Sequence, residues 1–312
     1  MTGTSKVKKI WNKKNKRRLF IILMLAYPVL HFLFFWVFIN INSIIMTFQT
    51  WHESTDFEDL GSSYFKFAGL LNYKVFFFNL AHDKHTQQMI LNSLSYVVLN
   101  IGIIFPLSLI AAYILFKKIP LGGFYRVMFF LPSIIPLAAL VVSFKSMVDS
   151  QQGSLIMLLQ MFKIPDPGFL KTTESMQMSI WIFMIWSGMG YNIILFSSAM
   201  ARMPIEILES GKLEGVSAPR ELLQICIPLI WPNITTMVML GLMSTFTVAM
   251  QPMMISGSVN NTIGLYIYSN SLGSNSGLVS AATLGLVCTA VAAPVVLLVR
   301  FFMERCFRDV TF

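Results

Sequence analysis

Six long apolar runs alternate with shorter polar segments along this chain of 312 residues. The runs are residues 19–38, 89–116, 124–148, 176–200, 234–255 and 278–302. A helix needs about 20 predominantly apolar residues to cross a bilayer, and each run is at least that long. The pattern therefore predicts an all-α membrane protein with six transmembrane helices, in a single domain over residues 19–312.

Composition agrees with this pattern. Hydrophobic residues make up 55% of the chain and charged residues 12%, whereas a soluble domain carries about a quarter charged residues. The three cysteines, Cys226, Cys288 and Cys306, lack the spacing of metal ligands. We therefore expect neither a soluble domain nor a disulfide framework nor a metal site.

The longest polar interruption in the second half of the chain is residues 203–232, referred to below as the loop 203–232. It contains four acids, Glu206, Glu209, Glu214 and Glu221. Its pattern predicts a helix, a break and a second helix from Pro219 to Ile227, because Pro suits the first helical turn. Pro228 and Pro232 are expected to end the second helix. Ile205, Leu208 and Leu213 form a short apolar stripe on the first.

Basic residues predict the orientation. If the six spans are correct, seventeen Lys and Arg residues lie on the side of the termini and six on the other side. The positive-inside rule then places both termini and the loop 203–232 in the cytoplasm, with residues 1–18 as a basic tail. The net charge of +9 is read as a topology signal and a contact with anionic lipid. No second basic surface accompanies the tail, so nucleic acid is not an expected partner.

The segment 49–85 between the first two spans is expected to lie outside. Its acids, Glu53, Asp56, Glu58 and Asp59, indicate a solvated loop. The aromatic stretch that begins at Tyr64 is typical of an interfacial amphipathic segment. In the third span, Pro132 and Pro136 predict a kink.

Two spans carry faces of small and hydroxyl residues. In the fourth span these are Met184, Ser187, Gly188 and Tyr191, and in the fifth span Gly241, Ser244, Thr245 and Val248. Such faces line a polar path or form close-packing seams between membrane helices, and the sequence leaves both alternatives open.

No energy source is visible in the chain itself. The middle of each predicted span lacks Asp and Glu, which argues against a carrier driven by protons or sodium. A phosphate-binding motif and a catalytic cluster are also missing from the sequence. The energy must therefore come from something bound to the chain, and the loop 203–232 is the expected place of contact.

That loop resembles the "EAA" loop of permease subunits in binding-protein-dependent ABC importers. The family pattern is Glu-Ala-Ala, then Asp-Gly-Ala, then Ile-x-x-Pro. The matching residues here are Glu209, Ser210 and Gly211, then Glu214, Gly215 and Val216, then Ile225 to Pro228. Ser-Gly replaces Ala-Ala. Further segments, such as FAGLLNYK from Phe67 and FYRVMFFLP from Phe124, resemble sugar permeases of the maltose type.

The resemblance implies a transport subunit of the bacterial cytoplasmic membrane that is not an enzyme and binds no cofactor itself. It would import a carbohydrate, most simply an oligosaccharide, by alternating access. The implied partners are a second permease, an ATPase dimer that binds ATP and Mg, and an extracellular solute-binding protein. The residues matched to the EAA loop would contact the ATPase. The sugar path would include the fourth- and fifth-span faces and also Ser133 and Leu137. Alternatives are a permease for a glycerol-phosphate compound, a secondary active transporter, and a membrane enzyme acting on lipid-linked sugars.

Overall fold

The computed structural model describes residues 13–53, 63–257, 259 and 261–306, and these are mostly helical. Four helices are long and apolar enough to cross a membrane: Asn15–Met46, Lys84–Phe116, Thr173–Met200 and Asn275–Cys306. Two bent pairs, Gly122–Ile134 with Leu137–Val148 and Ala218–Leu229 with Trp231–Thr245, raise the number to six if each pair is one span. The predicted tail lies mostly outside the described residues.

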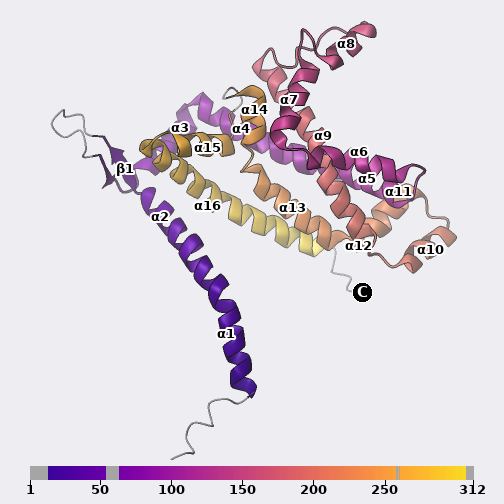
Figure 1. Cartoon of the computed structure of the whole chain (residues 1–312), viewed down its shortest axis with the longest axis horizontal. Coiled ribbons are helices and arrows are strands. Elements are labelled where there is room, and N and C mark those ends of the chain that lie inside the picture. The colour runs from indigo at the N-terminus through magenta and orange to yellow at the C-terminus, as the bar shows by residue number, and fades with distance from the viewer. Residues whose placement is uncertain (1–12, 54–62, 258, 260, 307–312) are drawn as a thin grey trace, which may run out of the picture.

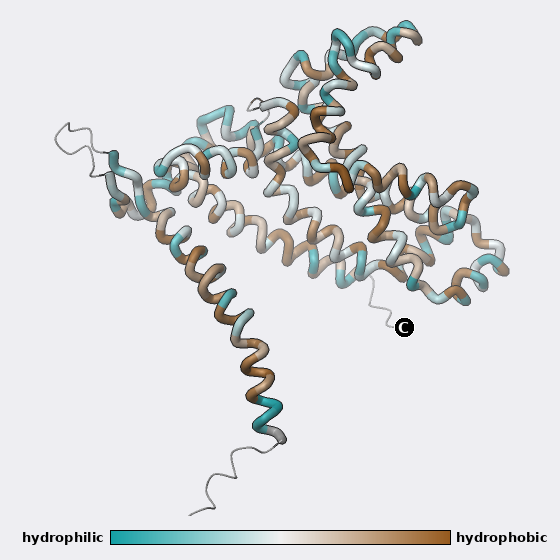
Figure 2. The backbone as a smooth tube through the Cα atoms, viewed as in Figure 1, coloured by the Kyte–Doolittle hydropathy of each residue, from teal (hydrophilic) through white to brown (hydrophobic). Residues whose placement is uncertain are grey.

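The N-terminal helix stands apart from the rest of the described chain. It consists of α1 (Lys13–His31), the π-helix η1 (Phe32–Val37) and α2 (Phe38–Met46). It leans away from the other helices in Figure 1, and its most apolar 18-residue window has no buried residue. Figure 2 shows that hydrophobic residues dominate much of its length. An exposed apolar helix of this length is suited to a surrounding of lipid or of other membrane helices.

A small β-hairpin follows this helix, so the prediction of an all-helical fold is wrong here. Strand β1 (Gln49–His52) pairs antiparallel with β2 (Tyr64–Phe67). The aromatic stretch from Tyr64 begins as a strand because aromatic residues favour pleated pairing, and Trp51 packs edge-on against Phe65 with ring centroids 4.8 Å apart. Of the predicted acidic loop, Asp56, Glu58 and Asp59 lie outside the described residues. The helix α3 (Leu71–His82) comes next.

One continuous helix forms the centre of the bundle. It runs through α4 (Lys84–Val97), the π-helix η2 (Val98–Ile104) and α5 (Phe105–Phe116). Asp83 caps its start by accepting hydrogen bonds from the backbone N–H groups of His85 and Thr86. The hydrogen bond from the Thr86 hydroxyl and then these two backbone bonds lower the pKa of Asp83. The α5 part packs along α9 (Thr173–Met200), and the largest buried cluster joins them to α13 (Trp231–Thr245) and α16 (Asn275–Cys306).

The third predicted span is broken rather than kinked. Helices α6 (Gly122–Ile134) and α7 (Leu137–Val148) meet at 106°. Pro136 is the N-cap of α7 and has an extended ψ of 134°, which ends the α6 helix sharply. A short helix, α8 (Ser154–Met161), follows α7.

The fifth predicted span is shorter than expected. Its helix α13 ends at Thr245, and α14 (Met250–Ser256) begins only after a break. The hydroxyl of Thr262 donates a hydrogen bond of 2.6 Å to the Val248 carbonyl in that break. Helix α15 (Ile263–Gly273) then leads into α16. A freed carbonyl inside the bundle therefore has a partner, as buried backbone requires.

Candidate functional site

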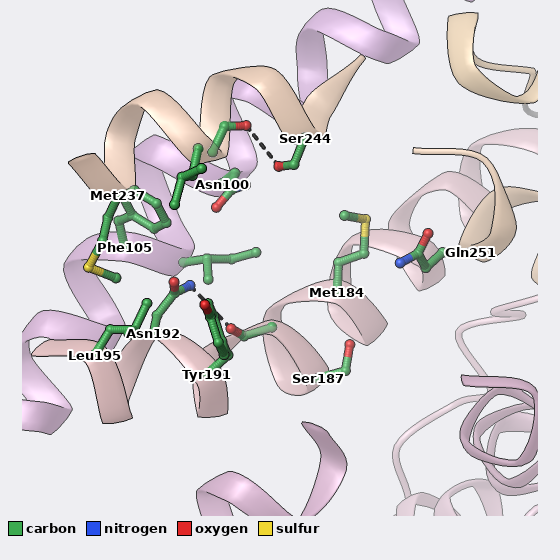
Figure 3. A pocket seen from close by; sticks show the side chains of 14 residues that line it. Asn100, Phe105, Met184, Ser187, Tyr191, Asn192, Leu195, Met237, Ser244 and Gln251 are labelled. Atoms are coloured by element: carbon green, nitrogen blue, oxygen red, sulfur yellow. Dashed lines mark hydrogen bonds between the residues drawn. The ribbon is translucent and has the colours of Figure 1, made fainter. Parts of the chain in front are cut away.

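A cavity of about 350 Å³ lies between the central helix, α9 and α13, and is referred to below as the polar cavity (Figure 3). Its lining residues are Asn100, Ile104, Phe105, Met184, Ser187, Gly188, Tyr191, Asn192, Leu195, Met237, Leu240, Gly241, Ser244 and Gln251. Figure 3 shows Asn100 and Ser244 on one side and Tyr191 and Asn192 on the other. Its volume is in the range of small-molecule sites.

Local helix geometry places these side chains on the wall. Asn100 and Ile104 belong to the π-helix η2, and Phe105 follows directly. Single π-helical turns inside α-helices occur frequently at functional sites, because the extra residue per turn changes which side chains face a neighbour. On α9 the lining residues recur at helical spacing, so they share one face of the helix.

Three polar groups on the wall have no hydrogen-bond partner among the described residues. These are the amides of Asn100 and Gln251 and the hydroxyl of Tyr191. In contrast, the Ser187 hydroxyl donates to the Phe183 carbonyl at 2.8 Å, and the Ser244 hydroxyl donates to the Gly241 carbonyl at 2.9 Å. The unpartnered amides and hydroxyl are able to donate and accept, which is the capacity that a ligand rich in hydroxyls requires.

The wall of the polar cavity carries no charge. All of its lining residues are neutral side chains or glycine. A buried carboxylate or phosphate would need a cationic partner, because an unpaired ion loses its hydration. The described wall therefore fits a neutral ligand, and Tyr191, which is 59% exposed, offers a ring face on which a sugar can stack.

Six of the residues predicted for the sugar path lie on this wall: Met184, Ser187, Gly188, Tyr191, Gly241 and Ser244. The other four lie elsewhere. Thr245 is 2% exposed, and its hydroxyl donates to the Gly241 carbonyl. Val248 and Leu137 pack against a separate buried cluster. Ser133 is exposed near the end of α6, just before the sharp bend. Their part in a sugar path stays a prediction.

Two amides on the wall, those of Asn100 and Asn192, are not among the residues predicted from the sequence. Asn100 is a polar residue inside the long apolar run 89–116, and Asn192 lies directly beside Tyr191. The position of Asn100 inside an apolar run was the signal that could have identified it, since an amide inside a membrane helix needs a partner or a function.

The loop 203–232 forms two helical pieces around a tight turn. The first is α10 (Ile205–Leu213), and the second is continuous through α11 (Ala218–Arg220), η3 (Glu221–Cys226) and α12 (Ile227–Leu229). Gly215 between them has φ +73°. Its N–H donates to the Lys212 carbonyl, and the Val216 N–H donates to the Gly211 carbonyl. This pair of bonds is a Schellman motif, which requires a left-handed residue at Gly215.

The remaining residues matched to the EAA loop have varied surroundings. Glu209, Ser210 and Glu214 are exposed, Val216 and Pro228 are partly buried, and Gly211 is buried. A Cβ at Gly211 would lie 3.0 Å from the Cδ1 atom of Ile225. Glycine therefore lets the two helical pieces approach closely, which gives a reason for Gly in place of the second Ala of the family pattern. Nothing in the structure explains Ser210 in place of the first.

Three details of the predicted loop are corrected. Of the apolar stripe only Leu208 is buried, whereas Ile205 is 63% and Leu213 89% exposed. Pro228 lies inside the last turn of the second piece, and Pro232 lies in the first turn of α13 rather than ending the preceding helix. Proline is accommodated in a first turn because its missing N–H has no partner there.

In the described part of the chain, no group of three or more possible metal ligands occurs.

Comparison with known proteins identifies the family to which the chain belongs. Residues 104–311 match the family described as "Binding-protein-dependent transport system inner membrane component". A probable ABC transporter permease protein of Mycoplasma genitalium is 28% identical over 216 residues, which span 67% of this chain and 65% of that protein. The lactose transport system permease protein LacF of Rhizobium radiobacter is 27% identical over 77% of this chain and 82% of its own length.

A solved structure shares the fold. A chain of a bacterial alginate ABC transporter, crystallised with its periplasmic protein carrying an alginate pentasaccharide, superposes with a TM-score of 0.78. The superposition covers 96% of this chain and 99% of that chain at 18% identity. The family match covers two thirds of the present sequence. The chain therefore belongs to the inner membrane components of binding-protein-dependent transport systems, the permease components of ABC transporters, and is not itself an enzyme.

Proposed function

We propose that this permease imports a neutral carbohydrate, an oligosaccharide, which an extracellular binding protein delivers. The observation that carries the proposal is the uncharged polar cavity, where two free amides, a free hydroxyl and an exposed aromatic ring converge. Hydrogen-bonding groups beside an aromatic face are suited to the hydroxyls and the apolar ring face of a sugar.

The relatives support a carbohydrate as the class of substrate. Their names include a lactose permease, a multiple sugar-binding transport permease and an arabinooligosaccharide permease. A glycerol-phosphate compound fits the polar cavity less well, because neither Lys nor Arg is among its described lining residues and a buried phosphate needs such a partner.

In the proposed complex, a second permease completes the membrane part and an ATPase dimer binds ATP and Mg. Both termini and the loop 203–232 face the cytoplasm. Glu209, Ser210, Gly211, Glu214, Gly215, Val216 and Pro228 form the contact with the ATPase. ATP-driven closure of the ATPase moves the two helical pieces of the loop and thereby changes which side of the membrane the polar cavity faces.

Reconstitution tests this function. The complex purified through a tag on this chain is placed in vesicles, with the loaded binding protein on one side and ATP on the other. We expect ATP hydrolysis to rise with the loaded binding protein, and neutral oligosaccharides to enter while acidic ones do not. Uptake driven by a proton or sodium gradient without ATP would contradict an ABC importer. Preferential uptake of a glycerol-phosphate compound would contradict the neutral sugar.

Substitution of Gly215 tests the loop. Gly215→Pro removes the N–H that bonds to Lys212 and forbids φ +73°. We expect the ATPase to be lost when the complex is purified through this chain. The control is Gly69→Pro, because Gly69 also has a left-handed φ, +58°, but lies beside the hairpin. Co-purification of the ATPase in unchanged amount with Gly215→Pro would count against the assigned contact.

A further inference from the structure

A buried ion pair joins the loop 203–232 to the central helix. The Nζ atom of Lys117, directly after α5, lies 2.5 and 2.6 Å from the two carboxylate oxygens of Glu221. The Glu221 residue is 3% exposed, and the Lys117 side chain is 29% exposed. Burial acts to lower the pKa of Lys117, but the hydrogen bond to Glu221, the negative charge of Glu221 and the neighbouring Tyr113 raise it overall. Lys117 is therefore charged at neutral pH.

A second contact lies one helical turn away. The hydroxyl of Tyr113 donates a hydrogen bond of 3.1 Å to the Ala218 carbonyl. Tyr113 and Lys117 are four residues apart at the end of α5, and Ala218 and Glu221 are three residues apart at the start of the second helical piece. These four residues form the clamp, a two-point attachment that fixes both the distance and the angle between the two helices.

The clamp distinguishes Glu221 from the other acids of the loop. Glu206, Glu209 and Glu214 are exposed, and none of them forms an ion pair with a described residue. A buried carboxylate that loses its cation is left without compensation, and breaking such a pair is strongly unfavourable. The second helical piece therefore cannot move away from α5 without a large cost, and the two move together.

The helix held by the clamp also forms part of the cavity wall. Asn100, Ile104 and Phe105 belong to the same uninterrupted helix as Tyr113. Phe105 precedes Lys117 by about three helical turns, or roughly 18 Å. Helix α5 packs closely along α9, which supplies the opposite wall. A displacement of the clamp is thus carried to both sides of the polar cavity by rigid elements.

We propose that Lys117 and Glu221 are positioning residues that transmit movement of the loop 203–232 to the polar cavity. This inference rests on the proposed function, because it requires an ATPase that moves the loop. Neither residue lines the polar cavity, and neither belongs to the residues proposed to contact the ATPase. The ion pair makes the loop and the central helix one mechanical unit, so that ATP hydrolysis and sugar movement stay linked. The π-helix η3 begins at Glu221, so the clamp holds the loop where its helical geometry changes.

The test measures sugar transported per ATP hydrolysed in the reconstituted complex. For Lys117→Gln and Glu221→Gln we expect this ratio to fall by about tenfold, which corresponds to about 1.4 kcal/mol of coupling, while ATP hydrolysis continues. Lys117→Arg retains the charge and should restore most of the ratio. Tyr113→Phe removes only the Ala218 contact and should lower the ratio by a smaller factor. The control is Glu304→Gln, which breaks the exposed pair of Arg300 and Glu304 and should change nothing.

Assembly and thermal stability are measured for the same variants. A merely structural brace would lower the amount of complex or its Tm and leave the ratio of sugar to ATP unchanged, and that result would overturn the inference. An unchanged ratio in fully assembled neutral variants would overturn it as well. If the unmodified complex shows no ATP-driven uptake, the proposed function itself is wrong. The two failures are therefore distinguishable.

Discussion

Two cavities of this protein share one wall residue and differ in almost every other respect. The polar cavity measures about 350 Å³ and has free amides and a hydroxyl on its wall. A second one, the apolar cavity, measures about 500 Å³ and is lined by Ile101, Phe105, Pro106, Leu109, Ile110, Phe196, Pro219, Leu222, Leu223, Ile227, Ile234 and Val238. Phe105 lines both.

The comparison shows that volume alone does not identify a substrate site. A sugar hydroxyl that entered the apolar cavity would exchange its hydrogen bonds with water for none, at a cost of about 1–3 kcal/mol for each group. The smaller cavity provides partners for the same groups. On the proposed function, selectivity comes from a few polar side chains on the wall, and Phe105 lies between the two environments.

The largest expected effect comes from removal of that separation. Phe105 is 8% exposed, and its ring packs edge-on against Phe196 with centroids 6.2 Å apart. Truncation of a buried Phe costs about 3–5 kcal/mol, so we expect Phe105→Ala to lower the Tm of the purified complex clearly. The variant also lacks the side chain that lies between the two cavities. We therefore expect sugar uptake to fall together with the Tm.

The control for Phe105→Ala is Leu223→Ala. Leu223 lines only the apolar cavity and is 62% exposed. Its truncation should alter stability by less than about 1 kcal/mol and leave sugar uptake unchanged. Equal losses in the two variants would show that both cavities serve transport, and the comparison would no longer hold.

A smaller effect is expected from Tyr191. Because Tyr191 is 59% exposed, Tyr191→Ala should leave the Tm nearly unchanged while the kcat/KM of sugar uptake falls at least about tenfold, or by about 1.4 kcal/mol. Tyr191→Phe retains the ring and loses only the hydroxyl, so its loss should be about threefold, within the net worth of one hydrogen bond. If Ala and Phe reduce uptake equally, the hydroxyl and not the ring recognises the sugar.

Four residues predicted to share one helical face in the fourth span all line the polar cavity, for a physical reason. α9 is an uninterrupted helix from Thr173 to Met200, so the spacing of Met184, Ser187, Gly188 and Tyr191 places them on one face. The same reasoning applied to the fifth span places Val248 on the face of Gly241. That placement of Val248 is wrong, because α13 ends at Thr245 and regular helical spacing ends with it.

Long-range pairing and irregular helices were not predictable in this way. The π-helix η2 shifts Asn100 relative to the regular helical spacing of the apolar run. Glu221 looked equivalent to the other three acids because its partner, Lys117, lies 104 residues earlier in the chain. In the sequence, Lys117 is only one of the seventeen basic residues on the side of the termini. The hairpin was missed because strands of four residues give too short a pattern to recognise.

The smallest expected effect compares two glycines inside helices. A Cβ at Gly241 would lie 3.0 Å from the Cζ atom of Phe105 and 3.6 Å from the Nδ2 atom of Asn100, whereas a Cβ at Gly285 on α16 would meet only the Cδ1 atom of Ile267, at 3.9 Å. Both changes to alanine gain similar helix propensity, up to about 1 kcal/mol. Any difference between them therefore reports the polar cavity itself. We expect Gly241→Ala to raise the KM for a large sugar by about threefold, or about 0.7 kcal/mol, because the Phe105 ring shifts into the polar cavity. Gly285→Ala should leave the KM unchanged. If the two variants behave alike in uptake measured across sugars of increasing length, the space beside Gly241 is not where the sugar passes.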